Sequence, residues 1–349
     1  MSDEETAAEG QRIVWNKGRK RARSRFRKTL SRNATYGFLR CLHAIVCRLP
    51  LPVGRGLAWC AGSLVYYLFG RERRIALDGL TRVYGAERSP SEIRSLARGM
   101  FRHHVQVVID WLIIRRWSRE RVERRFPDMA AACRDLHETH RRMGIGVVGI
   151  SGHFGNWELL NVFFGHFLPG TLALIAKRLY YPRYQDFIHR LRASSGNDII
   201  YTDESPRRIM RAVKDGKTAG FLPDQDVRTN SGVFVDFFGL PAYTVTAPVQ
   251  LALKLRVPLV VVLVVKKDPG FELVFSGPLD IPRTGDEDAD LLAGTQIWTR
   301  YLEEQIRAAP EQWAWLHPRW RTKPGSPRRL VDRRPRAGSG HSPPATESG

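Results

Sequence analysis

The chain has 349 residues, of which 43% are hydrophobic and 10% aromatic. A chain this apolar buries enough surface to fold, so its composition excludes an intrinsically disordered protein. Its formal net charge is +21 at pH 7, from 56 Lys and Arg against 35 Asp and Glu. The four cysteines form no CxxC pair, which argues against a zinc ribbon or a disulfide scaffold and favours a reducing compartment.

Most of the positive charge lies in two flanking segments. Residues 11–32 carry ten Lys and Arg and no acid, and residues 319–336 carry eight Lys and Arg with one acid. Nucleic acid, anionic lipid headgroups or an acidic protein would each complement such flanks. Composition alone therefore leaves three classes of partner open.

The first candidate element follows the basic arm. Residues 37–69 contain no acid, and their uncharged stretch is shorter than the about 20 apolar residues that span a bilayer. Aromatic residues beside a cationic arm are typical of an interfacial anchor, so we expect residues 36–70 to attach the protein to a membrane. The alternative is a pair of buried amphipathic helices interrupted at Pro50 and Pro52.

The pattern of the remaining chain changes near residue 145. Residues 71–142 are highly charged with a helical period, and Ser91 is placed to cap a helix. Beyond them, short β-branched runs alternate with helical segments, which predicts an α/β fold with a mostly parallel mixed sheet flanked by helices. The predicted strands are 146–150, 171–175, 198–201, 218–222 and 258–265.

These patterns divide the chain into four segments. We expect a basic flexible arm (1–35), helical membrane-anchoring residues (36–70), an α/β domain (71–323) and a tail (324–349). The tail is predicted to be disordered because it is rich in Pro, Gly, Ser and Arg.

The stretch from Ile150 to Leu160 is the strongest candidate for chemistry. It follows a buried strand, opens an amphipathic helix and contains His153 and Glu158. If His153 lies on the turn, Glu158 is predicted to accept one imidazole N–H and leave the other nitrogen as a general base for a substrate hydroxyl. Amides at the start of the helix would stabilise an oxyanion. A core histidine with satisfied hydrogen bonds is the alternative.

Two other interpretations of this stretch are less favoured. Gly149 to His153 approximates the G-x-S-x-G hydrolase elbow, which would make Ser151 a nucleophile, but His replaces the final Gly. A metal site lacks a second His at the H-E-x-x-H spacing. We therefore expect neither a metal nor a cofactor.

Asp224 and Asp226 form a second polar cluster, directly after the predicted strand 218–222. A carboxylate at the carboxyl end of a strand faces the ligand crevice of an α/β sheet. The alternatives are a metal site of a nucleotide-sugar transferase and a solvated turn capped by aspartates. Four cations, Lys177, Arg178, Arg190 and Arg192, would bind a phosphate or pair with these acids, and solvated helix faces are the alternative.

Three blocks of the sequence together resemble one known family. Ser-Gly-His-Phe-Gly-Asn-Trp-Glu (151–158), Leu-Pro-Asp-Gln-Asp (222–226) and Pro-Glu-Gln-Trp-Ala-Trp-Leu-His (310–317) occur in that order. They are similar to the bacterial lipid A biosynthesis acyltransferases, the lauroyl and myristoyl transferases of the lysophospholipid and glycerophosphate acyltransferase superfamily. The His-x4-acid motif is common to the superfamily, whereas its combination with the other blocks is more specific.

The resemblance implies an enzyme on the cytoplasmic face of the inner membrane, without metal or cofactor. Such an enzyme moves a fatty acyl chain from acyl carrier protein, or from acyl-CoA, to a hydroxyl of a lipid A precursor or related glycolipid. It implies that His153 is the base and Glu158 its partner. The residues that it implies for substrate binding are Lys177, Arg192, Asp224, Asp226 and Asn156.

The sequence departs from the family after Ala176. Lys-Arg-Leu-Tyr-Tyr-Pro stands where relatives have an arginine block followed by Asn-Pro or Asn-Asn. This region faces the acceptor headgroup, so a phosphatidylinositol mannoside or a lysophospholipid are alternative acceptors. A metal-dependent glycosyltransferase using Asp224 and Asp226 is a further alternative. We expect no nucleic-acid partner, because residues 11–32 contain little aromatic interleaving.

Overall fold

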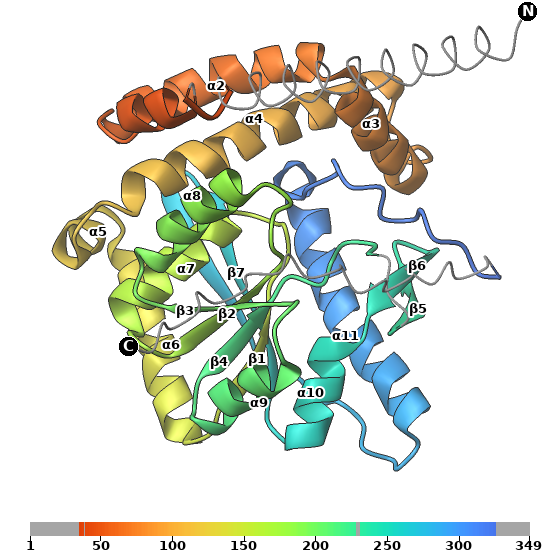
Figure 1. Cartoon of the computed structure of the whole chain (residues 1–349). Coiled ribbons are helices and arrows are strands. Elements are labelled where there is room, and N and C mark those ends of the chain that lie inside the picture. The colour runs from red at the N-terminus through yellow and green to blue at the C-terminus, as the bar shows by residue number, and fades with distance from the viewer. Residues whose placement is uncertain (1–34, 38, 228–230, 326–349) are drawn as a thin grey trace, which may run out of the picture.

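A computed structural model describes residues 35–37, 39–227 and 231–325 of the chain (Figure 1). The predicted arm (1–35) and tail (324–349) lie outside the described residues except at their inner margins. The described part is a mixed α/β structure with a mostly parallel sheet flanked by helices, as the alternating pattern predicts.

A layer of helices forms the N-terminal part of the described chain. Residues 39–46 are helical and are followed by α2 (Leu51–Leu68), α3 (Gly70–Tyr84) and α4 (Pro90–Ile114). The cap of α4 is Ser89 rather than the predicted Ser91. The Ser89 amide donates to Glu92 Oε2 (2.8 Å), and the Glu92 amide donates to Ser89 Oγ (3.4 Å), which completes a capping box.

The helix α2 lies along α4 with one face buried and the other exposed (Figure 1). A Cβ at Gly54 would lie 2.6 Å from Ile113 Cδ1, and one at Gly62 would lie 2.4 Å from Arg102 Cα, so only glycine permits this close approach. The opposite face carries the exposed apolar side chains Val53, Leu57, Leu64, Tyr67 and Leu68, and Trp59 is exposed at the margin beside α4. The alternative prediction of buried helices is therefore correct for the face of α2 that packs on α4 and wrong for its exposed face.

None of the helices that the structure describes combines the length and the apolar content that crossing a bilayer requires. The helical character of the predicted anchor is confirmed, whereas its attachment to a membrane stays a prediction.

The sheet has six strands in the order β3-β2-β4-β1-β7-β8. Its parallel strands are β1 (Val147–Ile150), β2 (Leu172–Ala176), β3 (Asp198–Tyr201), β4 (Thr218–Phe221) and β7 (Leu259–Lys267), all close to their predicted ranges. The sequence analysis missed the antiparallel edge strand β8 (Gly270–Pro278) and the separate hairpin of β5 (Gly232–Phe237) and β6 (Leu240–Val245).

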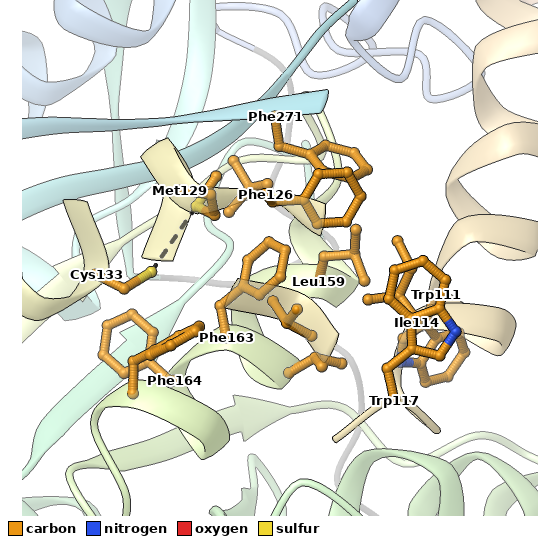
Figure 2. Close-up of a cluster of buried hydrophobic side chains, with 14 of the residues drawn as sticks. Trp111, Ile114, Trp117, Phe126, Met129, Cys133, Leu159, Phe163, Phe164 and Phe271 are labelled. Carbon is orange, nitrogen blue, oxygen red and sulfur yellow. Dashed lines mark hydrogen bonds between the residues drawn. The ribbon is translucent and has the colours of Figure 1, made fainter. Parts of the chain in front are cut away.

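Helices cover both faces of the sheet, and alternate residues of β7 supply the two cores. Val260, Val262 and Val264 pack in one cluster with α6 (Pro127–Met143) and α7 (Trp157–Phe167). Figure 2 shows aromatic residues of this cluster, including Phe163 of α7. The intervening β7 residues pack in a second cluster with α10 (Ala247–Leu255) and α11 (Glu287–Ala308).

Three further helices complete the described part. They are α5 (Arg119–Arg125), α8 (Pro182–Ala193) and α9 (Pro206–Lys214), and a 3-10 turn (Pro310–Gln312) follows α11. The carboxyl ends of the parallel strands remain open to a cleft, which positions the candidate site.

Candidate active site

Three candidate residues meet at the carboxyl edge of the sheet. His153 stands three residues after β1, Asp224 three residues after β4, and Lys177 directly after β2. Since β4 lies between β1 and β2, adjacent strands bring together residues that are far apart in the sequence.

Asp224 is the hydrogen-bond partner of the His153 imidazole. His153 Nδ1 lies 2.7 Å from Asp224 Oδ1, and the His153 amide donates to Asp224 Oδ2 over 2.8 Å. Trp313 Nε1 also donates to Oδ2, over 2.9 Å. A carboxylate that accepts at Nδ1 fixes the tautomer with its proton on that nitrogen. The other nitrogen, Nε2, has no hydrogen-bond partner within the described chain and is left as an acceptor.

Electrostatics favour the charged forms of this pair. Burial alone would lower the pKa of His153, but the charge and hydrogen bond of Asp224, with a smaller contribution from Glu158, raise the pKa above 6.5. Burial alone would raise the pKa of Asp224, but His153 and the bonds from Trp313 and the His153 amide bring that pKa down to about 2. Asp224 therefore stays ionised beside an imidazole that is a stronger base than usual.

The loop that carries His153 is held by distant segments. Gly155 has φ 59°, and a Cβ there would lie 2.1 Å from the Val264 carbonyl oxygen, so the turn requires glycine. The Gly155 amide donates to the Gln312 carbonyl over 3.1 Å, and the Ala314 amide donates to the His153 carbonyl over 2.9 Å. The His153 backbone is therefore fixed from both sides.

A buried histidine of α4 supports the same loop. His103 Nε2 lies 3.0 Å from the Gly155 carbonyl oxygen. Burial lowers the pKa of His103 to about 3, so this imidazole is neutral and donates its proton to that carbonyl.

The predicted hydrogen bond between His153 and Glu158 is wrong. Glu158 is the second residue of α7 and faces α8, where its carboxylate accepts from Arg192 Nη2 (2.5 Å) and Nε (3.1 Å). The side chains of Glu158 and Arg192 nevertheless both line the cleft beside His153. Glu158 therefore acts on His153 through its charge, and it fixes the position of Arg192.

Three residues predicted to bind substrate are outside the cleft lining, namely Asp224, whose carboxylate is buried against His153, Asp226 and Asn156. Asp226 is fully buried and accepts from the Thr322 amide (2.7 Å) and hydroxyl (2.9 Å) and from Arg321. Asn156 is buried as the cap of α7, with its Oδ1 accepting from the Leu159 amide (3.2 Å) and its Nδ2 donating to the Val107 carbonyl. Asp226 and Asn156 hold the fold around the site.

The geometry disfavours the metal and nucleophile alternatives. Asp224 and Asp226 point at different protein donors, so they do not share a cation site. No group of three His, Cys, Asp or Glu residues in the described part of the chain is arranged to hold a metal. Ser151 is buried with no hydrogen bond to its hydroxyl in the described residues, and it is outside the cleft lining.

The cleft has a volume of about 1820 Å³ and extends from the sheet edge between α9 and α10. His153, Trp157, Glu158, Lys177 and Arg192 contribute polar groups to its lining. Its apolar lining includes Leu174 of β2, Ile209 and Met210 of α9, and Leu251 of α10. The cleft therefore combines the His153 imidazole, an apolar lining and five cationic side chains, namely Lys177, Arg192, Lys254, Arg256 and Arg283.

Trp313 is a site residue that the sequence analysis did not single out. It follows the 3-10 turn in the Glu-Gln-Trp block, is buried, and reaches Asp224 across 89 residues of sequence. The block carried the family resemblance, but nothing in its local pattern indicates the hydrogen bond to Asp224.

Comparisons with known proteins match most of the chain. The profile of a family described as bacterial lipid A biosynthesis acyltransferase matches residues 23–322. The lipid A biosynthesis lauroyltransferase of Escherichia coli is 26% identical over 288 residues, covering 80% of this chain and 89% of that protein. The palmitoleoyltransferase of the same organism is 24% identical over 280 residues, covering 79% and 88%. A phosphatidylinositol mannoside acyltransferase of Mycobacterium tuberculosis is 25% identical over 185 residues, covering 51% and 55%.

Proposed function

Since the chain belongs to the bacterial lipid A biosynthesis acyltransferase family, it is an acyltransferase, and we propose that it moves a fatty acyl chain from acyl carrier protein to a hydroxyl of a lipid A precursor or related glycolipid. The observation that carries this proposal is the orientation of the His153 imidazole. Its Nδ1 is hydrogen-bonded to Asp224, and its Nε2 has no hydrogen-bond partner in the described residues, at a position where His153 lines the cleft. This is the arrangement that a general base for a hydroxyl requires.

The proposed reaction proceeds in two proton transfers. His153 Nε2 takes the proton of the acceptor hydroxyl as its oxygen attacks the thioester carbonyl, and Asp224 stabilises the imidazolium that forms. The tetrahedral intermediate then collapses, the carbon–sulfur bond breaks, and the imidazolium returns its proton to the departing thiolate. An ester bond replaces the thioester bond, and His153 is again neutral.

Groups around His153 are placed to support this chemistry. The first amides of α7, at Trp157 and Glu158, have no acceptor within their own helix and are available to a developing oxyanion. Lys177 and Arg192 line the cleft beside the base, and we propose that they bind anionic groups of the acceptor. Glu158 is proposed as a positioning residue that holds Arg192.

The dimensions of the cleft suit two amphiphilic substrates. Its volume of about 1820 Å³ exceeds the about 300 to 1,000 Å³ of an ordinary small-molecule pocket. A fatty acyl chain would lie against Ile209, Met210 and Leu251, with its thioester carbon at His153. The acceptor headgroup would lie on the side of Lys177 and Arg192.

We further propose that α2 attaches the enzyme to the cytoplasmic face of the inner membrane. Its exposed apolar residues form one stripe along the helix, which suits insertion at a membrane interface. Both the acceptor lipid and the acylated product would then remain in the membrane while the acyl donor arrives from solution.

A second acceptor class follows from the third relative. The match to the phosphatidylinositol mannoside acyltransferase and the unusual residues after Ala176, which include Lys177, make a mannosylated inositol lipid the alternative acceptor. Carrier protein and acyl-CoA are likewise alternative donors.

Reconstitution in neutral detergent micelles tests the proposal. The purified chain would be supplied with acyl carrier protein or CoA carrying one fatty acid, and with a lipid A precursor or a phosphatidylinositol mannoside. We expect mass spectrometry to show one added acyl chain on one acceptor, with carrier protein as the better donor. Absence of acylation on every acceptor, with lipids unchanged in cells lacking the gene, would refute the proposed function.

A further inference from the structure

A second hollow, of about 550 Å³, lies where the start of α2 meets α5. Residues 50–52 form one wall, and Trp117 with three arginines, Arg121, Arg124 and Arg125, forms the other. None of these residues lines the cleft of His153. In Figure 1, α5 lies at the end of α4 and beside the start of α2, on the side of the layer away from α3.

The arginines of this hollow have no carboxylate partner in the described part of the chain. Glu123, on the same short helix, instead pairs with Arg119 (3.2 Å) and Arg134 (3.1 Å). Glu120 is engaged by Ser118 and acts on Arg124 only through its charge. Three guanidinium groups therefore surround the hollow with most of their charge uncompensated.

Buried aromatic rings hold two of these arginines in place. The Arg121 guanidinium lies 4.4 Å from the centre of the Trp117 ring, and that of Arg125 lies 5.7 Å from the centre of the Phe126 ring. Trp117 and Phe126 are stacked, with 6.0 Å between their centres, inside the cluster drawn in Figure 2. The guanidinium groups of Arg121 and Arg125 are therefore held against buried, closely packed rings.

The hollow adjoins the exposed apolar face of α2. Pro52 belongs to its wall, and the next residue, Val53, begins the apolar stripe that continues through Leu57 and Leu64. A soluble anion would use only the arginines, whereas a phospholipid presents phosphate and hydrocarbon together. The continuity of charge with apolar surface therefore favours a lipid.

We propose that this hollow binds the phosphodiester headgroup of an anionic phospholipid in the membrane on which α2 rests. The proposal deepens the membrane attachment proposed above and depends on it. Arginine suits this ligand because its planar guanidinium group makes paired hydrogen bonds to phosphate oxygens. The bound headgroup would hold one end of α2. The exposed apolar side chains along α2 would contact the hydrocarbon beneath the headgroups.

Vesicle binding by the full chain tests the proposal. The probe is a phosphatidylcholine vesicle with or without phosphatidylglycerol, and the variant carries Arg121→Gln, Arg124→Gln and Arg125→Gln. Since each basic residue near an anionic surface contributes about fivefold to binding, we expect partitioning onto phosphatidylglycerol vesicles to fall about 100-fold. Binding to pure phosphatidylcholine should stay the same.

A matched variant separates a site from diffuse charge. Arg207→Gln, Lys214→Gln and Arg300→Gln remove the same charge from exposed positions of α9 and α11. We expect this control to lose less than about threefold, because charges far from the membrane are screened. An equal loss in both variants, or no loss in the α5 variant, would overturn the proposal.

A second variant preserves the charge and the fold. Arg121→Lys, Arg124→Lys and Arg125→Lys should still lose several-fold in binding, because lysine cannot make paired bonds to phosphate. Unchanged binding of this variant would show that charge alone acts here. Acyl transfer by the wild-type enzyme in neutral micelles is measured separately, so failure of the headgroup site leaves the proposed function standing.

Discussion

The loop that carries His153 and the exposed face of α2 differ in how strongly contacts with the rest of the fold restrain them. The loop is fixed by bonds from segments far away in the sequence, including β7, α4 and residues 312–314. The outer face of α2 instead leaves large apolar side chains exposed, among them Leu57 and Leu64. The contrast teaches that the proposed chemistry relies on geometry set by the fold, whereas the proposed membrane attachment relies on surface that the fold leaves uncovered.

The largest effect is expected at His153, the proposed base. His153→Ala removes the proton acceptor, and since general base catalysis contributes about 100- to 10,000-fold, transfer should fall to near the limit of detection. The protein should remain folded by circular dichroism and should bind vesicles normally. The matched control is His137→Ala on α6, outside the cleft lining. Substantial activity in the His153 variant would overturn the mechanism.

The next effect is expected at the partner of the base. Three donors converge on the Asp224 carboxylate, and an Asn would turn its own N–H₂ group toward one of them. A reversed imidazole tautomer would then carry its proton on Nε2, so Asp224→Asn should slow transfer by about 1,000-fold. Asp226→Asn is the matched control, because its contacts hold Arg321 and Thr322 instead.

The pH profile of the same variant gives a second readout. The neutral imidazole is the active form, and the pKa of His153 lies above 6.5, so the rate should fall as pH drops through a value above 6.5. Loss of the Asp224 charge lowers the pKa of His153 and should move this fall to lower pH. An unmoved profile would contradict the assigned pair.

A smaller effect is expected when the apolar stripe is broken. Leu57→Ser with Leu64→Ser removes exposed hydrocarbon from the outer face of α2. We expect vesicle binding to weaken about 10- to 30-fold, from partial loss of burial at the membrane. Transfer in detergent micelles should be unaffected. The exposed residues Ile145 and Leu292 provide the control pair Ile145→Ser and Leu292→Ser, and equal weakening there would argue against α2 as the contact surface.

The smallest effect is expected at Glu158. Glu158→Gln removes a negative charge that raises the pKa of His153, and it loosens the bond to Arg192. We expect turnover to fall about 10-fold, a typical loss for a residue that acts through another. The Michaelis constant for the acceptor should rise, and the pH profile should move less than in Asp224→Asn. A loss as large as that of His153→Ala would make Glu158 part of the proton relay.

Local patterns predicted the elements better than the contacts. Short β-branched runs between helical segments predicted all five parallel strands, and the signal is clearest in β7, where a strand covered on both faces has a continuous apolar signature. The strands β5, β6 and β8 were missed because they are partly exposed and carry a mixed pattern.

The candidate site shows the same limit. His153 was predicted from its glycine turn and from the helix that follows it. Its partner was misassigned, because Asp224 is 71 residues away and reaches it only through the order of β1 and β4 in the sheet. Glu158 was chosen instead because it is close in sequence.

The segment that follows α11, near the C-terminal end of the described residues, forms bonds that hold the candidate site in place. Trp313 bonds to Asp224, the Gln312 carbonyl bonds to the loop, and Thr322 bonds to Asp226. During synthesis these residues leave the ribosome after every strand of the sheet. A nascent chain therefore has its sheet and the proposed base His153 before the imidazole is correctly oriented, and that orientation is reached only once residues 312–322 have been made.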